Sequence, residues 1–215
     1  MSEAQLPEEI LEHVLRLVLS VSEREFCKFR DNTLGQGRGW VSLSTSAGHA
    51  PVSHLLLISR RWLRIGSPLL YEGVVLREQK HTKAVAHIIS FDTHLGEEIK
   101  YLRLEGGLGK HLPVVLAHAP NVHTLYISLH VPASEAIRGL HKALSLVHPR
   151  KLYIYYRTSE FRSTKAMREA KRYLQSAIAT QWETLVSTTT GGSSTTADVC
   201  IIYFRPLSSS AIIFA

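Results

Sequence analysis

The sequence predicts an α/β fold, with a small N-terminal helical head followed by a short, irregular solenoid of parallel strands and helices. Apolar residues at helical spacing follow Pro7, which indicates an amphipathic first helix. A strand-like apolar pattern then recurs between residues 71 and 154, with helix-like stretches between the copies. The 215 residues are 45% hydrophobic and 20% charged, the composition of a globular chain that buries a core.

The first helix is predicted from Pro7 to near Ser20. Proline suits a first helical turn because its missing N–H has no partner there, and Glu8 and Glu9 favour the positive end of the helix dipole. The apolar stripe consists of Ile10, Leu11, Val14, Leu15 and Val18.

A flexible insert is predicted over residues 21–53, because the apolar periodicity is lost there and glycine, serine and threonine accumulate. A second helical region begins near Ser53. The tripeptide Gly66-Ser67-Pro68 predicts a break in it or the start of a new helix.

The repeat has the pattern apolar-x-x-apolar-x-apolar and a step of roughly 23 to 33 residues, which is the range of leucine-rich repeats. Its copies are Tyr71-x-x-Val74-x-Leu76, Ile99-x-x-Leu102-x-Leu104, Val122-x-x-Leu125-x-Ile127 and Pro149-x-x-Leu152-x-Ile154, with a weaker copy at 182–187. Period two places Leu102 and Leu104 on one face of a strand and Arg103 on the other.

Helices are expected between these strands, at residues 82–91, 111–118, 133–147 and 163–180. Alternation of strands and helices predicts a parallel sheet with helices on one side. A non-repetitive α/β domain remains the alternative.

Three regions follow from this pattern. Residues 1–72 form the helical head with its insert, and residues 73–186 form the solenoid. Residues 187–215 form a Ser/Thr/Gly linker and an irregular tail, in which residues 199–204 are able to add one more strand.

The net charge is +7 and the isoelectric point is near 9.5. The basic residues are scattered, which favours a solvated surface or a contact with an acidic protein over nucleic-acid binding.

We expect no transmembrane helix and no signal peptide, because long apolar runs are lacking and the N-terminus is acidic. The two cysteines, Cys27 and Cys200, lie far apart, which argues against a disulfide framework or a cysteine zinc site. An intracellular location, in the cytoplasm or nucleus, fits best.

A search for catalytic motifs gives no candidate. The segment Gly106–Lys110 resembles a phosphate loop, but Leu104 and His111 stand where that loop needs glycine and serine or threonine. We therefore expect a strand-to-helix turn. The histidine spacings do not form a paired metal-ligand set. The sequence predicts no enzyme, no cofactor and no metal.

Two segments of the head carry a family resemblance. Leu6-Pro7-Glu8-Glu9-Ile10-Leu11 is followed, after the insert, by Ile58-Ser59-Arg60-Arg61-Trp62 and Leu69-Leu70-Tyr71. Together these segments resemble the F-box, especially in the F-box-like proteins of mushroom-forming fungi, whose substrate-binding half is commonly built of leucine-rich repeats. The insert is a departure, since the F-box is normally almost contiguous.

The resemblance implies a non-enzymatic adaptor. The head would bind a Skp-type adaptor protein and through it a cullin-based SCF ubiquitin ligase, while the repeat half would bind an unknown target protein. The adaptor-binding candidates are Leu6, Pro7, Ile10, Leu11, Val14, Leu15, Leu57, Ile58, Trp62, Leu70 and Tyr71. The expected target-binding face is Lys100, Tyr101, Arg103, His123, Tyr126, Arg150, Lys151 and Tyr153, which stand at or beside the x positions of the repeats. An interaction module without ligase binding and a basic nucleic-acid-binding protein remain alternatives.

Overall fold

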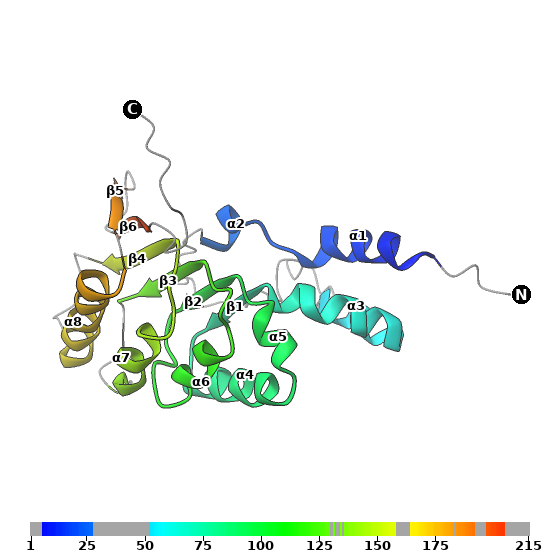
Figure 1. Ribbon diagram of the computed structural model, residues 1–215, viewed down its shortest axis with the longest axis horizontal. Helices are drawn as coiled ribbons and strands as arrows, with labels where there is room; N and C mark the ends of the chain where they lie inside the picture. Colours follow the sequence, from blue (N-terminus) through cyan, green and yellow to red (C-terminus); the bar gives the residue numbers. More distant parts are fainter. Residues whose placement is uncertain are drawn as a thin grey trace, which may run out of the picture. The chain divides into compact units, whose positions relative to one another are not determined.

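The computed structural model describes residues 6–27, 52–129, 131, 134, 136–157, 164–182, 184–191 and 197–204 (Figure 1). The chain divides into two compact units, Met1–Gly73 and Val74–Ala215. The first unit is helical, and the second is an α/β unit with one sheet.

Helix α1 (Glu8–Leu19) confirms the predicted first helix. Pro7 stands at its N-cap, acidic residues occupy its first turn and Arg16 lies in its last turn, so both ends complement the helix dipole. Leu11, Leu15 and Leu19, spaced by four residues, are its buried positions.

Helix α1 runs parallel to helix α3 (Arg60–Tyr71). At the N-terminal ends, Glu8 pairs with Arg64, and at the C-terminal ends the Ser20 hydroxyl donates to the Glu72 carboxylate over 3.1 Å. Residues 20–59 connect the C-terminal end of α1 to the N-terminal end of α3.

The ends of the predicted insert are ordered, so its assignment as a flexible loop is wrong there. Residues Glu23–Cys27 form α2, in which Phe26 is 1% exposed, and Val52–Leu57 form the 3₁₀ helix η4. The aromatic ring of Phe26 packs beside Gly73. The middle of the insert, residues 28–51, lies outside the described residues.

The core of the first unit joins α1, η4 and α3. Its buried residues are Leu11, Leu15, Leu19, Leu56 and Leu69, with Trp62, Ile65 and Leu70 packed against them. Helix α3 continues through Pro68, so the predicted break at residues 66–68 is wrong. The missing N–H of Pro68 is tolerated because the continuing helix buries Leu69 in this core.

The second unit alternates strands and helices. Its elements are β1 (Gly73–Leu76), α4 (Gln79–Phe91), α5 (Thr93–Glu97), β2 (Tyr101–Leu104), α6 (Leu112–Ala117), β3 (Thr124–Ser128), α7 (Arg138–Leu144), β4 (Lys151–Arg157) and α8 (Lys165–Thr180). Strands β1 to β4 form a four-stranded parallel sheet in sequential order, with helices α4, α6 and α7 on one face (Figure 1). The predicted α/β class and its parallel strands are confirmed.

The sheet ends in two antiparallel strands. Strand β6 (Ala197–Phe204) pairs with β4, and β5 (Thr184–Gly191) pairs with β6. The extra strand expected at 199–204 is confirmed. The linker assignment is wrong at residues 187–191, where β-branched threonines favour an extended strand.

The register aligns the repeats residue by residue. Leu102, Leu125 and Leu152 are register partners on β2, β3 and β4 and form one row across the sheet. Leu104, Ile127 and Ile154 form the next row on the same face of the sheet. Leu102, Leu125 and Leu152 are completely buried, as are Leu112 and Val115 of α6 and Leu140 of α7. The core of the second unit therefore lies between this face and the helices, as period two predicts.

Candidate functional site

Helix α1 carries a second apolar face besides the one in the core. The exposed residues of this face, which we call the α1 stripe, are Leu6, Ile10, Val14, Leu17 and Val18. Leu6 precedes the helix, and the others follow at spacings of four, four, three and one residues, so they lie on one side of it. Leu17 is 73% exposed. Glu9, Glu12 and Arg16 occupy the remaining exposed arc of the helix, whereas Glu8 lies on the side of α3 and pairs with Arg64.

Among its described residues, the same unit exposes three more large aliphatic side chains, which are Leu57 at the end of η4, Ile58 after it and Leu63 in α3. Exposed single aliphatic residues are common on protein surfaces. Exposed aliphatic residues that gather on one helix face, as in the α1 stripe, form an apolar surface of the kind that marks a protein-binding site.

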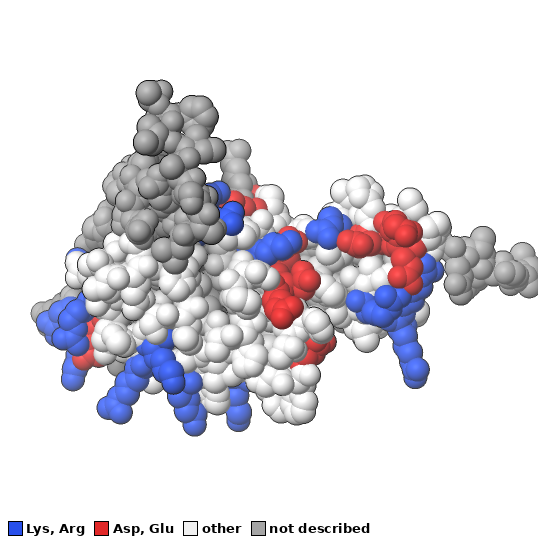
Figure 2. Space-filling model, in the orientation of Figure 1, with Lys and Arg blue, Asp and Glu red and all other residues white. Residues whose placement is uncertain are grey.

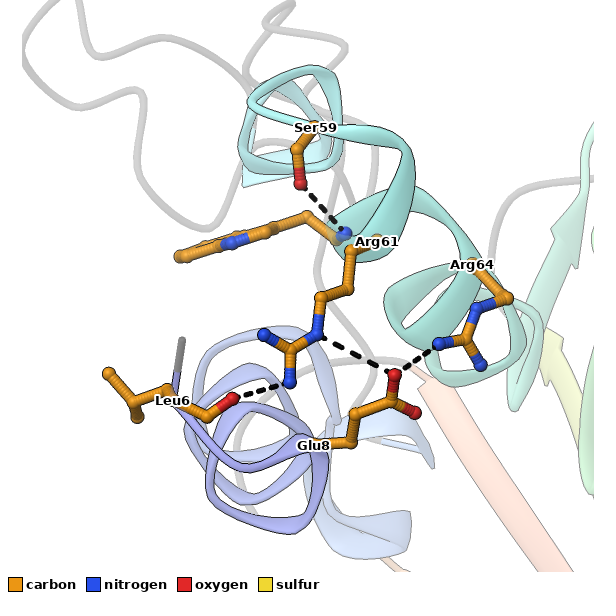
Figure 3. A network of polar contacts seen from close by, with 6 residues as sticks. Leu6, Glu8, Ser59, Arg61 and Arg64 are labelled. Carbon is orange, nitrogen blue, oxygen red and sulfur yellow. Dashed lines mark hydrogen bonds and ion pairs between the residues drawn. The ribbon is translucent and has the colours of Figure 1, made fainter. Parts of the chain in front are cut away.

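An ionic network fixes the start of α1 against α3 (Figure 3). Arg64 pairs with the Glu8 carboxylate at 2.5 Å, and Arg61 approaches the same oxygen at 3.6 Å. Arg61 also donates to the backbone carbonyl of Leu6. The Ser59 hydroxyl accepts a hydrogen bond from the Trp62 N–H and caps α3. The network holds Leu6, the first residue of the α1 stripe, beside α3.

The structure divides the predicted adaptor-binding residues into two groups. Leu6, Pro7, Ile10, Val14, Leu57 and Ile58 are exposed. Leu11 and Leu15 are buried in the unit's own core, so their assignment as contact residues is wrong. Trp62, Leu70 and Tyr71 are partly buried, and the first two pack on that core.

Sequence reasoning missed three exposed residues, Leu17, Val18 and Leu63. Splitting the apolar arc of α1 into an inner and an outer half would have found the first two, because residues 11, 15 and 19 already form one complete stripe.

The sheet face opposite the helices carries an aligned row of polar and aromatic side chains. Arg103, Tyr126 and Tyr153 occupy equivalent register positions on β2, β3 and β4. The Arg103 guanidinium lies 4.2 Å from the centroid of the Tyr126 ring, and the rings of Tyr126 and Tyr153 stack with centroids 6.4 Å apart.

Glu105 anchors this row at its basic end. Its two carboxylate oxygens accept from Arg103 Nε at 2.6 Å and from Arg77 Nε at 2.8 Å. The Glu105 side chain is 17% exposed and that of Arg103 is 6% exposed, so their ion pair is largely shielded from solvent, whereas Arg77 is 29% exposed. Such shielding makes the Arg103–Glu105 pair depend on both of its charges being present.

The predicted target-binding face is only partly accessible. Arg103 and Tyr126 are buried, so their assignment as exposed contact residues is wrong. Arg150 is exposed, and Lys100, Tyr101, His123, Lys151 and Tyr153 are half-buried. Tyr101 and His123 pack edge to face, with their ring centroids 5.0 Å apart. Period two shows which residues share a face, but it does not show whether that face is covered.

The glycines at residues 106–109 serve the backbone. Gly107 has a φ of +70°, and a Cβ atom added to it would lie 2.1 Å from Thr82 Oγ1. A Cβ atom at Gly106 would lie 2.1 Å from the Arg77 carbonyl oxygen. The segment is thus a close-packed turn between β2 and α6, as expected.

Two negative findings concern the described part of the chain. No group of three or more His, Cys, Asp or Glu residues there is arranged to hold a metal ion. Within the same residues, every helix is too short or too polar to cross a bilayer.

Comparison with protein-family models, with curated proteins and with solved structures found no match to the chain. The geometry itself defines the class: an α/β protein with a separate helical unit that exposes an apolar stripe.

Proposed function

We propose that the chain is an F-box-like adaptor, in which the helical unit docks on a Skp-type adaptor of an SCF ubiquitin ligase. The second unit, a leucine-rich-repeat-like solenoid, binds the target protein. The observation that carries the proposal is the α1 stripe, which stands beside a core that is already complete without it.

A helix that served only its own core would be polar on its outer side. The outer residues Ile10, Val14 and Val18 are instead between 43% and 51% exposed. Removing a large aliphatic side chain from water contributes about 1.5–3 kcal/mol, so a few of these residues together support a stable contact. The F-box-like residues around Pro7 and Trp62 make a Skp-type adaptor the partner that best fits this stripe.

The solenoid assignment is supported by the sequential strand order and by the in-register aliphatic rows of β2, β3 and β4. Each of these strands contributes one leucine or isoleucine to each row, as stacked repeats do. Target contacts fall to the accessible members of the predicted face, which are Lys100, Tyr101, His123, Arg150, Lys151 and Tyr153.

A binding experiment with the full chain and an immobilised fungal Skp-type adaptor tests the proposal. The double variant Ile10→Asp/Val14→Asp places two carboxylates in the α1 stripe, and it should abolish retention because each charge would lose its hydration in the contact. Arg16→Asp is the matched control, because Arg16 is exposed on the same helix beside Glu12, on the arc that faces away from the stripe, and it should bind like wild type.

Equal retention of the double variant and wild type would show that the stripe is not the docking surface. If the wild-type chain is not retained either, the proposal of a ubiquitin-ligase adaptor is wrong. The chain would then be an interaction module of another kind. Circular dichroism of each variant separates a binding defect from unfolding.

A further inference from the structure

Helices α4 and α6 of the second unit enclose a groove that the proposed function does not use. Its volume is about 510 Å³, and its lining residues are Lys80, Lys83, Ala84, Ala86, His87, Ser90, His111 and Val114. The groove lies on the helical side of the sheet, whereas the expected target face lies on the opposite side.

The charge of the groove has one sign. Figure 2 shows Lys and Arg side chains (blue) projecting from the side of the second unit on which Figure 1 draws α4, α6 and α7. Among the described residues that line it, two carry ammonium groups and two carry imidazoles, while none carries a carboxylate. Glu78, at the N-cap of α4, contacts Lys80 at 2.8 Å, and this hydrogen bond with Lys80 lowers the pKa of the Glu78 carboxyl. Both side chains of that pair are more than half exposed, so it competes only weakly with a ligand carboxylate.

Three of the residues that line the groove are aliphatic, namely Ala84 and Ala86 of α4 and Val114 of α6. Their side chains offer contact area but no hydrogen-bond donor. The groove therefore suits an apolar side chain flanked by acidic groups better than a continuous row of phosphates.

An exposed aromatic residue extends the groove by one turn of α4. Phe91 is 81% exposed, and its ring packs edge to face against His87, a lining residue, with centroids 4.8 Å apart. Ile88 beside it is 41% exposed. The surface therefore passes from lysines at the start of α4 to an aromatic and an aliphatic side chain at its end.

We propose that this groove binds an acidic amphipathic segment of a partner protein. Asp or Glu side chains of the segment pair with Lys80 and Lys83, and an apolar side chain between them rests on Ala84, Val114 and Phe91. The site is independent of adaptor docking by the first unit, since all its residues belong to the second.

A random peptide library displayed on phage and panned against the full chain tests this proposal without a known partner. We expect the enriched peptides to combine Asp or Glu with Leu, Phe or Trp. Synthetic copies should bind the Lys83→Glu and Phe91→Ser variants about tenfold more weakly, because one change reverses a charge contact and the other removes an apolar anchor.

Lys171→Glu is the matched control, because Lys171 is exposed on α8, away from the groove, and this variant should bind the peptides like wild type. All of the substituted residues are exposed, so the variants should fold, and thermal melting verifies this.

The proposal is overturned if panning enriches no acidic peptides, or if their binding ignores Lys83 and Phe91. A single-stranded oligonucleotide that displaces the peptides and binds with a steep log-linear salt dependence would assign the groove to nucleic acid instead.

Discussion

Arg103 and Tyr126 stand at the same register position on neighbouring strands, with the guanidinium 4.2 Å from the ring centroid and both side chains buried. A buried cation stacked on an aromatic ring is a structural contact as much as a recognition feature. The row therefore stabilises the sheet.

Tyr126→Ala should destabilise the chain by about 3–5 kcal/mol, because it leaves a large cavity and removes the surface under the Arg103 guanidinium. Leu125→Ala, on the opposite face of the same strand, should cost about 2–5 kcal/mol for the loss of packing against the helices. Urea unfolding of both variants measures this. A Tyr126→Ala chain as stable as wild type would contradict the burial of this face.

Glu105→Gln should destabilise the chain by about 2 kcal/mol, because it removes the shared negative charge between Arg77 and the largely buried Arg103. The control is Glu12→Gln, which removes the exposed pair with Arg16 and should change stability by less than about 0.5 kcal/mol. Equal effects of the two substitutions in urea unfolding would mean that the Glu105 network is effectively solvated.

Phe26→Ala should cost about 3–5 kcal/mol, because Phe26 is 1% exposed. Phe91→Ala makes the same chemical change at a residue that is 81% exposed, and it should stay within about 0.5 kcal/mol of wild type. Thermal unfolding of the Phe26→Ala and Phe91→Ala variants compares their stabilities. A harmless Phe26→Ala would restore the interpretation of residues 23–27 as a loose segment.

Gly107→Ala should destabilise the chain by about 2–4 kcal/mol, because its φ of +70° disfavours a side chain and the added Cβ atom meets Thr82 Oγ1. Thr82→Ala removes the closest contact of the added Cβ atom, but it also removes the buried hydrogen bond from Thr82 Oγ1 to the Gly107 carbonyl. Comparing the double variant with Thr82→Ala alone should therefore show a smaller loss from Gly107→Ala than in the wild-type background. A fully tolerated Gly107→Ala would contradict the close-packed turn.

The periodicity of apolar residues in the sequence predicted much of the fold. The spacing of Leu11 and Leu15 predicted α1, and the recurring leucines of the repeats predicted the register Leu102–Leu125–Leu152. Both are local patterns that the tertiary structure reinforces. The repeat residues were located correctly, but the accessibility of Arg103 and Tyr126 was not, because burial depends on packing that a single strand does not encode.

Local breaker signals were the least informative. Pro68 sits inside α3 because the burial of Leu69 in the core outweighs one lost hydrogen bond. The threonines of β5 look like linker residues by composition, yet β-branched residues also favour an extended backbone, and this segment pairs with β6. In the candidate site, the sequence predicted that α1 has an apolar side. It did not predict which of these apolar residues are buried, because that depends on contacts with Leu56 and Leu69, which lie far away in the sequence.

Titration calorimetry of the full chain against a Skp-type adaptor tests the central claim most directly. We predict one-to-one binding with a dissociation constant below about 10 μM. We also predict a negative heat-capacity change, because formation of the complex would remove the apolar side chains of the α1 stripe from contact with water. If no binding heat is detected at several temperatures with the adaptor at about 10⁻⁵ M, the claim that this stripe is an adaptor-docking surface is contradicted.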